Sequence, residues 1–120
     1  MSEAKKFVYK STPGIIVWPC KVSEPVNGGA REEATLTVRF NVLPQERIEE
    51  AFPRLAIMQD PKLARAFLEE AVVGFDGLTD DKGKSVDGQK VKAQLLAQPY
   101  IHDGVLEGYF DMIGRRLTKN

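Results

Sequence analysis

Two segments in the N-terminal half alternate apolar and polar residues with the period of a β-strand. In residues 15–22, one face of the predicted strand holds Ile16, Trp18, Cys20 and Val22. In residues 34–42, the corresponding face holds Leu36, Val38, Phe40 and Val42. A period of two places such side chains on one side of a strand. We therefore expect two strands, each with one buried and one solvated face.

The segment between these strands is rich in turn-forming residues. Residues 23–32 contain Pro25 and Asn27-Gly28-Gly29, which favour an extended hairpin loop between two antiparallel strands. Pro19 has no backbone N–H, and prolines within sheets are confined mainly to edge strands and bulges. The sequence therefore places the first strand at a sheet edge or gives it a bulge.

Helical periodicity dominates the rest of the chain. A short helix is expected between Pro44 and Pro53, because apolar residues recur at helical spacing until the second proline. A second helix is predicted over residues 61–73, with Asp60 as its N-cap and Pro61 in its first turn.

Four glycines in residues 74–88 predict a small β-hairpin, with Gly83 at a positive φ angle in its turn. A third helix, around Val91 to Leu96, is expected to stop before Pro99. A final helix is predicted from about Pro99 to Leu117.

Length and element order define the expected fold. At 120 residues the chain fits one domain, residues 1–120, with residues 1–13 as a loose arm or a short strand. The predicted class is α+β. An N-terminal antiparallel β-hairpin or small sheet packs against three to four C-terminal helices and carries a small β-hairpin insert.

Charge and composition exclude several classes of protein. The 17 basic and 17 acidic residues cancel, so no long-range field favours nucleic acid or an anionic membrane surface. No apolar run approaches the roughly 20 residues that cross a bilayer. A lone cysteine and the absence of a signal-like segment at the N-terminus favour a soluble cytosolic protein.

Candidate catalytic and metal-binding residues are sparse. His102 is the single histidine, and the adjacent Asp103 is expected to point in a different direction on a helix. Cys20 alternates with apolar residues and is interpreted as a small buried hydrophobe. The acidic residues Asp76, Asp80, Asp81 and Asp87 lack the spacing of a calcium loop. We therefore predict no catalytic residue, no metal site and no cofactor.

The final helix carries apolar residues on two stripes. One stripe consists of Ile101, Val105, Tyr109 and Met112, and the other of Leu106, Phe110, Ile113 and Leu117. Together they exceed the arc that usually faces a core. Two alternatives remain open: this helix is the central helix of the fold, or it offers a face to a partner or a second copy. In the second case the predicted protein-binding residues are Tyr109, Phe110, Ile113 and Leu117.

Gly104 and Gly108 lie one helical turn apart in the same helix. Glycine lowers helix stability by up to about 1 kcal/mol relative to alanine, so close packing must compensate. The pair therefore predicts that a neighbouring backbone approaches the helix.

Several segments, taken in order, resemble those of a known family. In the N-terminal half they are Val17-Trp18-Pro19-Cys20-Lys21-Val22, Glu24-Pro25, Gly28-Gly29 and Ala34-Thr35-Leu36-Thr37-Val38-Arg39-Phe40. In the C-terminal half they are Val73-Gly74-Phe75-Asp76-Gly77-Leu78, Leu95-Leu96, Pro99-Tyr100 and Lys119-Asn120. From about Ile15 onward, the chain resembles the small tail assembly chaperones of long-tailed bacteriophages and prophages.

The resemblance implies a non-enzymatic function in viral tail morphogenesis. Such a protein binds the hydrophobic tape measure protein in the host cytoplasm and helps to recruit tail tube protein; self-association is left open. The alternative is a structural tail or head–tail component retained in the virion. A third hypothesis, a small hydrolase or transferase using His102 with a carboxylate, has the least support from the sequence.

Overall fold

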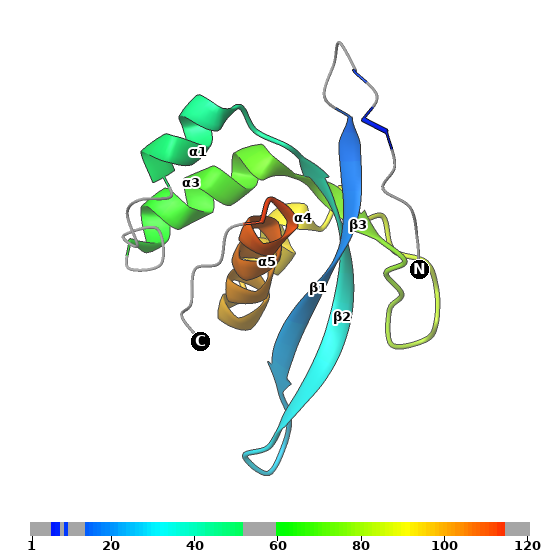
Figure 1. The fold of residues 1–120 in the computed structure, drawn as a ribbon. Coiled ribbons are helices and arrows are strands. Elements are labelled where there is room, and N and C mark those ends of the chain that lie inside the picture. The colour runs from blue at the N-terminus through cyan, green and yellow to red at the C-terminus, as the bar shows by residue number, and fades with distance from the viewer. Residues whose placement is uncertain (1–5, 8, 10–13, 52–59, 115–120) are drawn as a thin grey trace.

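The computed structural model describes residues 6–7, 9, 14–51 and 60–114. These residues form a three-stranded antiparallel sheet in the order β1-β2-β3, with helices on one side of it (Figure 1). The strands are β1 (Ile15–Pro25), β2 (Arg31–Asn41) and β3 (Val72–Asp76). The α+β class predicted from the sequence is confirmed.

The N-terminal hairpin is confirmed, but its strands are longer than predicted. β1 and β2 pair along their whole lengths, from Ile15 opposite Asn41 to Pro25 opposite Arg31. The Val26 N–H donates to the Ala30 carbonyl at 3.0 Å, so the connecting loop is short rather than extended. β1 lies at the edge of the sheet, as Pro19 predicted.

The third strand was not predicted. The helix α3 (Pro61–Ala71) ends where β3 begins, and Val72 and Val73, which the periodicity assigned to the helix, start the strand. β3 pairs with β2 from Thr37 opposite Asp76 to Phe40 opposite Val72, and the register shifts between Arg39 and Phe40, so that Val73 has no partner residue in the register. The strand is buried, so its apolar run lacks the alternation by which strands are recognised.

The remaining helices are α1 (Gln45–Ala51), α4 (Lys92–Leu96) and α5 (Pro99–Met112). The predicted cap of α3 is confirmed, because the Asp60 side chain accepts hydrogen bonds from the N–H groups of Lys62 and Leu63 at 3.1 and 3.2 Å. The prediction that the final helix reaches Leu117 is wrong. α5 ends at Met112, and Gly114 adopts a φ of 81°, which is typical of the residue that terminates a helix.

The small hairpin after β3 is confirmed. Thr79 and Ser85 form a bridge, and the Val86 N–H donates to the Leu78 carbonyl at 2.9 Å. Gly83 occupies the turn with a φ of 82°, as predicted. After this hairpin the chain returns along β3, where Gly88 packs so closely on Phe75 that a β-carbon at Gly88 would overlap the Phe75 backbone.

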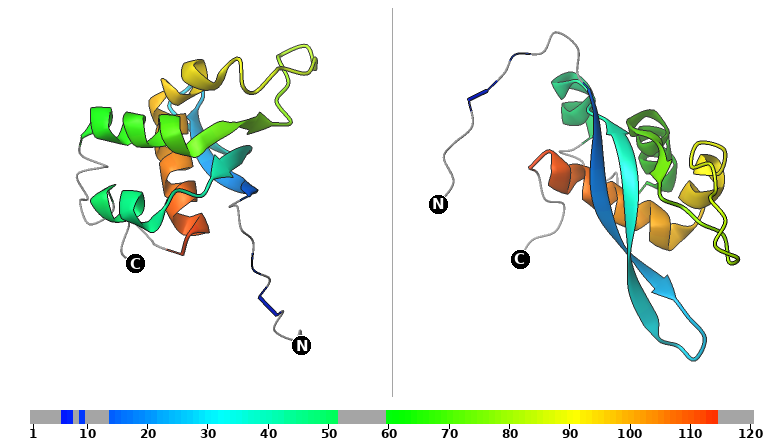
Figure 2. Two further views of the ribbon diagram at one scale, coloured as in Figure 1. Left: turned by 90° about the horizontal axis from the view of Figure 1, so that it is seen from above. Right: turned by 90° about the vertical axis from the view of Figure 1, so that its right-hand side faces the viewer.

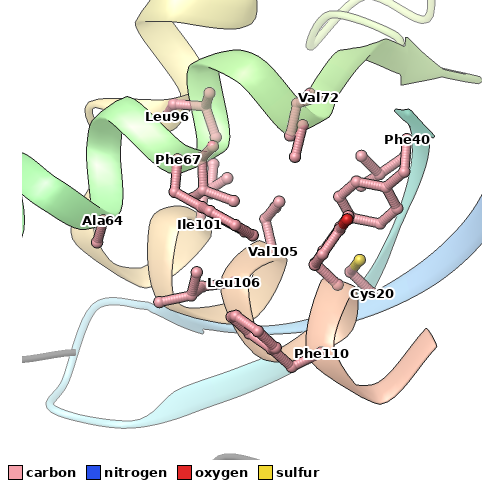
Figure 3. Close-up of a cluster of buried hydrophobic side chains, with 14 of the residues drawn as sticks. Cys20, Phe40, Ala64, Phe67, Val72, Leu96, Ile101, Val105, Leu106 and Phe110 are labelled. Carbon is pink, nitrogen blue, oxygen red and sulfur yellow. The ribbon is translucent and has the colours of Figure 1, made fainter. Parts of the chain in front are cut away.

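The core lies between the sheet and the helices (Figures 2 and 3). It combines Phe40 from β2, Phe67 from α3, and Val105 and Phe110 from α5, all with no exposed surface. The rings of Phe67 and Phe110 stack with centroids 5.4 Å apart. α5 therefore contacts both the sheet and α3, which is the position of a central helix.

α5 crosses β1 at its two internal glycines. A β-carbon at Gly104 would lie 2.5 Å from the Lys21 carbonyl oxygen and 2.8 Å from Val22 Cγ1. A β-carbon at Gly108 would overlap the Cys20 Sγ. The predicted approach of a neighbouring backbone is confirmed, and the backbone is that of β1.

One buried hydrogen bond ties the chain after β2 to α5. The Leu43 N–H donates to the Tyr109 hydroxyl oxygen at 2.9 Å. Tyr109 has no exposed surface, and its ring makes edge contacts with Phe40 and Phe67, both at centroid distances of 5.2 Å. The hydroxyl thus accepts a hydrogen bond from the backbone N–H of Leu43, just before α1 begins.

Tyr109→Phe is expected to destabilise the fold by about 1–3 kcal/mol, because it leaves the Leu43 N–H unsatisfied in the interior. Urea denaturation followed by far-UV circular dichroism measures the loss. Tyr100→Phe is the matched control, since Tyr100 is half-buried and its hydroxyl makes no hydrogen bond with the described residues. Equal stability of both variants would contradict a structural role for the Tyr109 hydroxyl.

Candidate protein-binding surface

Among the described residues, the protein-binding residues predicted on the final helix are buried or half-buried. Tyr109 and Phe110 have no exposed surface, and Ile113 is half-buried against the core. Leu117 lies outside the described residues. The interpretation of Tyr109 and Phe110 as an open face is therefore wrong for this structure. The described residues of both stripes are buried or half-buried, because α5 is covered by the sheet on one side and by α3 on another.

The large exposed hydrophobic side chains among the described residues lie at the start of β1 and just before it. Ile15, Ile16 and Val17 are 49%, 39% and 49% exposed. In the preceding segment, Phe7 and Tyr9 are 92% and 82% exposed. Isolated exposed apolar residues are common, but a contiguous group of them marks a candidate interaction site.

Residues 15–17 of this group lie on a sheet edge with which no other described strand pairs. Figure 2 shows β1 as the outermost strand, with β2 between it and β3. Hydrogen-bonded and non-hydrogen-bonded residue pairs alternate along an antiparallel ladder. Since Val26 and Ala30 form a bonded pair, the even-numbered residues of β1 direct their N–H and C=O groups toward β2.

The odd-numbered residues of β1 consequently direct their backbone groups away from the sheet. Ile15 and Val17 each present an N–H and a carbonyl oxygen there, and Pro19 presents a carbonyl oxygen alone. The missing N–H of Pro19 costs no bond with β2, which explains physically why a proline occurs within this strand. An extended polypeptide is the chemical complement of such an edge.

Residues 15–19 form an open part of this edge among the described residues. Farther along β1, the Lys21 carbonyl oxygen lies against Gly104 of α5. At the opposite side of the sheet, the segment around Gly88 packs on the Phe75 backbone and covers β3. We name residues 15–19 the β1 edge.

The face of the sheet opposite the helices is mainly polar. Arg39 Nε donates to both carboxylate oxygens of Asp76, at 2.9 and 3.1 Å, and both side chains are partly exposed. A shallow hollow beside this ion pair is also lined by Asp87 and Gln89. The ion pair stabilises the β2–β3 pairing weakly, as exposed pairs do.

The prediction that His102 and Asp103 point apart is wrong. His102 Nδ1 and Asp103 Oδ1 are 3.2 Å apart, with the carboxylate side chain 65% exposed. Within the described ranges, no group of three His, Cys, Asp or Glu side chains is arranged as metal ligands. The His102 side chain is only 15% exposed, so the pair joins a largely covered imidazole to a solvent-facing carboxylate on α5.

Cys20 is a buried hydrophobe, as predicted. Its side chain is 1% exposed and packs beneath Gly108. Burial, with a smaller contribution from the negative charge of Asp111, raises the pKa of the thiol to about 12. The reactive thiolate is therefore scarce near neutral pH.

Alkylation of Cys20 by iodoacetamide at mildly alkaline pH is expected to be more than about a hundredfold slower in the folded protein than in urea, because both burial and the raised pKa oppose it. Mass spectrometry of timed samples gives the two rates. Similar rates in both conditions would show that the thiol is accessible and that α5 does not cover it.

Comparisons of the chain with protein-family models, with curated proteins and with solved structures found no match. No helix within the described residues has the length and apolar character needed to cross a membrane.

The sequence contains a signal for the β1 edge that lies outside the alternation of apolar and polar residues. Ile15-Ile16-Val17-Trp18 is apolar at every position, although only one face of this strand is buried. A strand with one solvated face normally alternates. The excess apolar residues therefore indicated a second contact surface at the start of β1.

Proposed function

We propose that this chain is a non-enzymatic tail assembly chaperone of a long-tailed bacteriophage or prophage. It binds an apolar segment of the tape measure protein in the host cytoplasm and aids the assembly of tail tube protein around it. The observation that carries the proposal is the β1 edge, which combines unpaired backbone groups with exposed Ile15, Ile16 and Val17. The family resemblance of the sequence supports the choice of client.

The β1 edge suits a chaperone because its contacts depend little on the client's sequence. Backbone hydrogen bonds recognise any extended segment, and uncharged side chains exclude water from any apolar one. Such contacts hold a hydrophobic client without demanding a unique motif. The N-terminal aromatic residues Phe7 and Tyr9 lie close in sequence and offer further apolar surface.

A copurification experiment tests the proposal. The tagged chain is co-expressed with overlapping segments of the tape measure protein encoded in the same phage genome. We expect at least one apolar segment to copurify with the wild-type chain. The double variant Ile15→Lys, Val17→Lys is expected to lose most of this recovery, because two charges then lie where the client would be desolvated.

Thr35→Lys is the matched control, since Thr35 is exposed on the central strand and is not an edge residue. Circular dichroism confirms that each variant is folded. Recovery of no tape measure segment by the wild-type chain, or equal recovery by all folded variants, would contradict the proposal.

The second candidate is a structural tail or head–tail component. An open sheet edge also suits a subunit that joins its neighbours permanently through strand pairing. Mass spectrometry of purified virions distinguishes the candidates. A chaperone is absent from finished particles, whereas a structural component is present in them in stoichiometric amounts.

A further inference from the structure

We infer that two copies of this chain associate through their β1 edges in the absence of another partner. The strands pair antiparallel about a two-fold axis at Val17 and join two three-stranded sheets into one. Residues 15–19 of one copy then lie opposite residues 19–15 of the second copy.

The backbone groups of the β1 edge complement themselves in this arrangement. Val17 exchanges two hydrogen bonds with Val17 of the second copy. On each side, the Ile15 N–H donates to the Pro19 carbonyl of the other copy. Because Pro19 has no N–H, the Ile15 carbonyl of the other copy receives no hydrogen bond from it. This carbonyl lies at the end of the ladder, where water can bind it.

The side chains are compatible with the same register. Ile16 lies opposite Trp18 of the second copy on the side of the sheet that faces the helices. Ile15 and Val17 lie on the other side, with Pro19. Residues 15–19 contain no charge, so no like charges are brought together, and the chain as a whole has zero formal net charge.

The surroundings of Lys21 favour this register over a longer one. A register that paired Ile15 with Lys21 would require the Lys21 carbonyl, which lies against Gly104 of α5. It would also bring a lysine into the ladder. The interface is consequently short, and interfaces smaller than the standard size give weak, reversible association.

The oligomeric state of the full-length chain tests the inference. Sedimentation equilibrium over a concentration series is expected to show a reversible monomer–dimer equilibrium. Val17→Lys is expected to remain folded and monomeric, because it places two ammonium groups opposite each other at the axis. The control Thr35→Lys is expected to dimerise as the wild type does. A wild-type chain that stays monomeric at millimolar concentration overturns the inference, as does a Val17→Lys variant that dimerises normally.

Cross-linking tests the register. With a short bis-maleimide reagent, Val17→Cys is expected to form covalent dimers with itself. Ile15→Cys mixed with Pro19→Cys is expected to form mixed covalent dimers. The control Thr35→Cys is expected to form no covalent dimer, either with itself or with another variant. Cys20 is 1% exposed and does not compete. Efficient cross-linking of Thr35→Cys, or mixed dimers of Ile15→Cys with Val17→Cys in place of the expected pair, overturns the two-fold at Val17.

In the dimer, the second copy occupies the β1 edge to which a client would bind. The dimer would therefore have to dissociate before a client binds. This consequence rests on the proposed function, whereas dimerisation of the isolated chain does not. One combination of results separates the two proposals: the wild type dimerises, Val17→Lys does not, and the wild type binds no tape measure segment. That combination would contradict the proposed function and support the dimer.

Discussion

Phe110→Asp is expected to abolish the folded state rather than to remove a binding contact. Phe110 has no exposed surface and stacks on Phe67, while Tyr109 meets it edge-on at a centroid distance of 5.6 Å. Truncating a buried phenylalanine costs about 3–5 kcal/mol, and an unpaired buried carboxylate adds to this. Small domains have roughly 5–15 kcal/mol of stability in total, so little of it would remain.

Circular dichroism and the dispersion of amide signals in a proton–nitrogen NMR spectrum measure this outcome. Val17→Asp is the matched control, because Val17 is 49% exposed and its substitution should leave the fold intact. A folded Phe110→Asp variant that had lost its partner would contradict the central position of α5. It would also restore the alternative in which this helix presents an open face.

Gly104→Ala and Gly108→Ala are each expected to destabilise the protein by about 1–3 kcal/mol, which is the usual cost of inserting a methyl group into a packed contact. Helix propensity alone predicts the opposite sign, a gain of up to about 1 kcal/mol for alanine. At Gly104 the new methyl group would meet the Lys21 carbonyl, and at Gly108 it would meet the Cys20 sulfur. The crossing of α5 over β1 must therefore widen in either variant.

Urea denaturation of both variants determines whether each substitution raises or lowers the free energy of unfolding. Glu107→Ala serves as the control, because Glu107 is exposed on the same helix between the two glycines and should change stability by less than about 0.5 kcal/mol. Stabilisation by either glycine substitution would mean that α5 does not lie against β1 in solution. Destabilisation of Gly108→Ala should also make Cys20 more reactive toward alkylating reagents.

Local signals predicted most of the fold. Alternation identified the two strands of the hairpin, and Pro19 predicted that the first one lies at an edge. Asp60-Pro61 gave the start of α3, and Pro99 gave the start of α5. These features are properties of a few neighbouring residues, because capping, proline geometry and side-chain periodicity act within a turn or a strand.

The candidate binding surface was not predicted, because exposure depends on contacts between distant segments. The two apolar stripes of α5 have the same composition whether or not another element covers them. β2 brings Phe40 to Tyr109, and α3 brings Phe67 to the same ring, although both are far away in the sequence. Those contacts bury Tyr109 completely, while the polar side of the same helix stays exposed at Glu107.

The sequence by itself determined the two hairpin strands, the helices, the order of these elements and the absence of net charge. The tertiary structure decided that Val72–Asp76 is a strand, that α5 is central, and that the apolar start of β1 remains open. The physical reason is that burial is a property of packed layers. Removing a hydrophobic side chain from water is favourable in free energy. Only the fold determines whether the side chain is buried by its own chain or by another one.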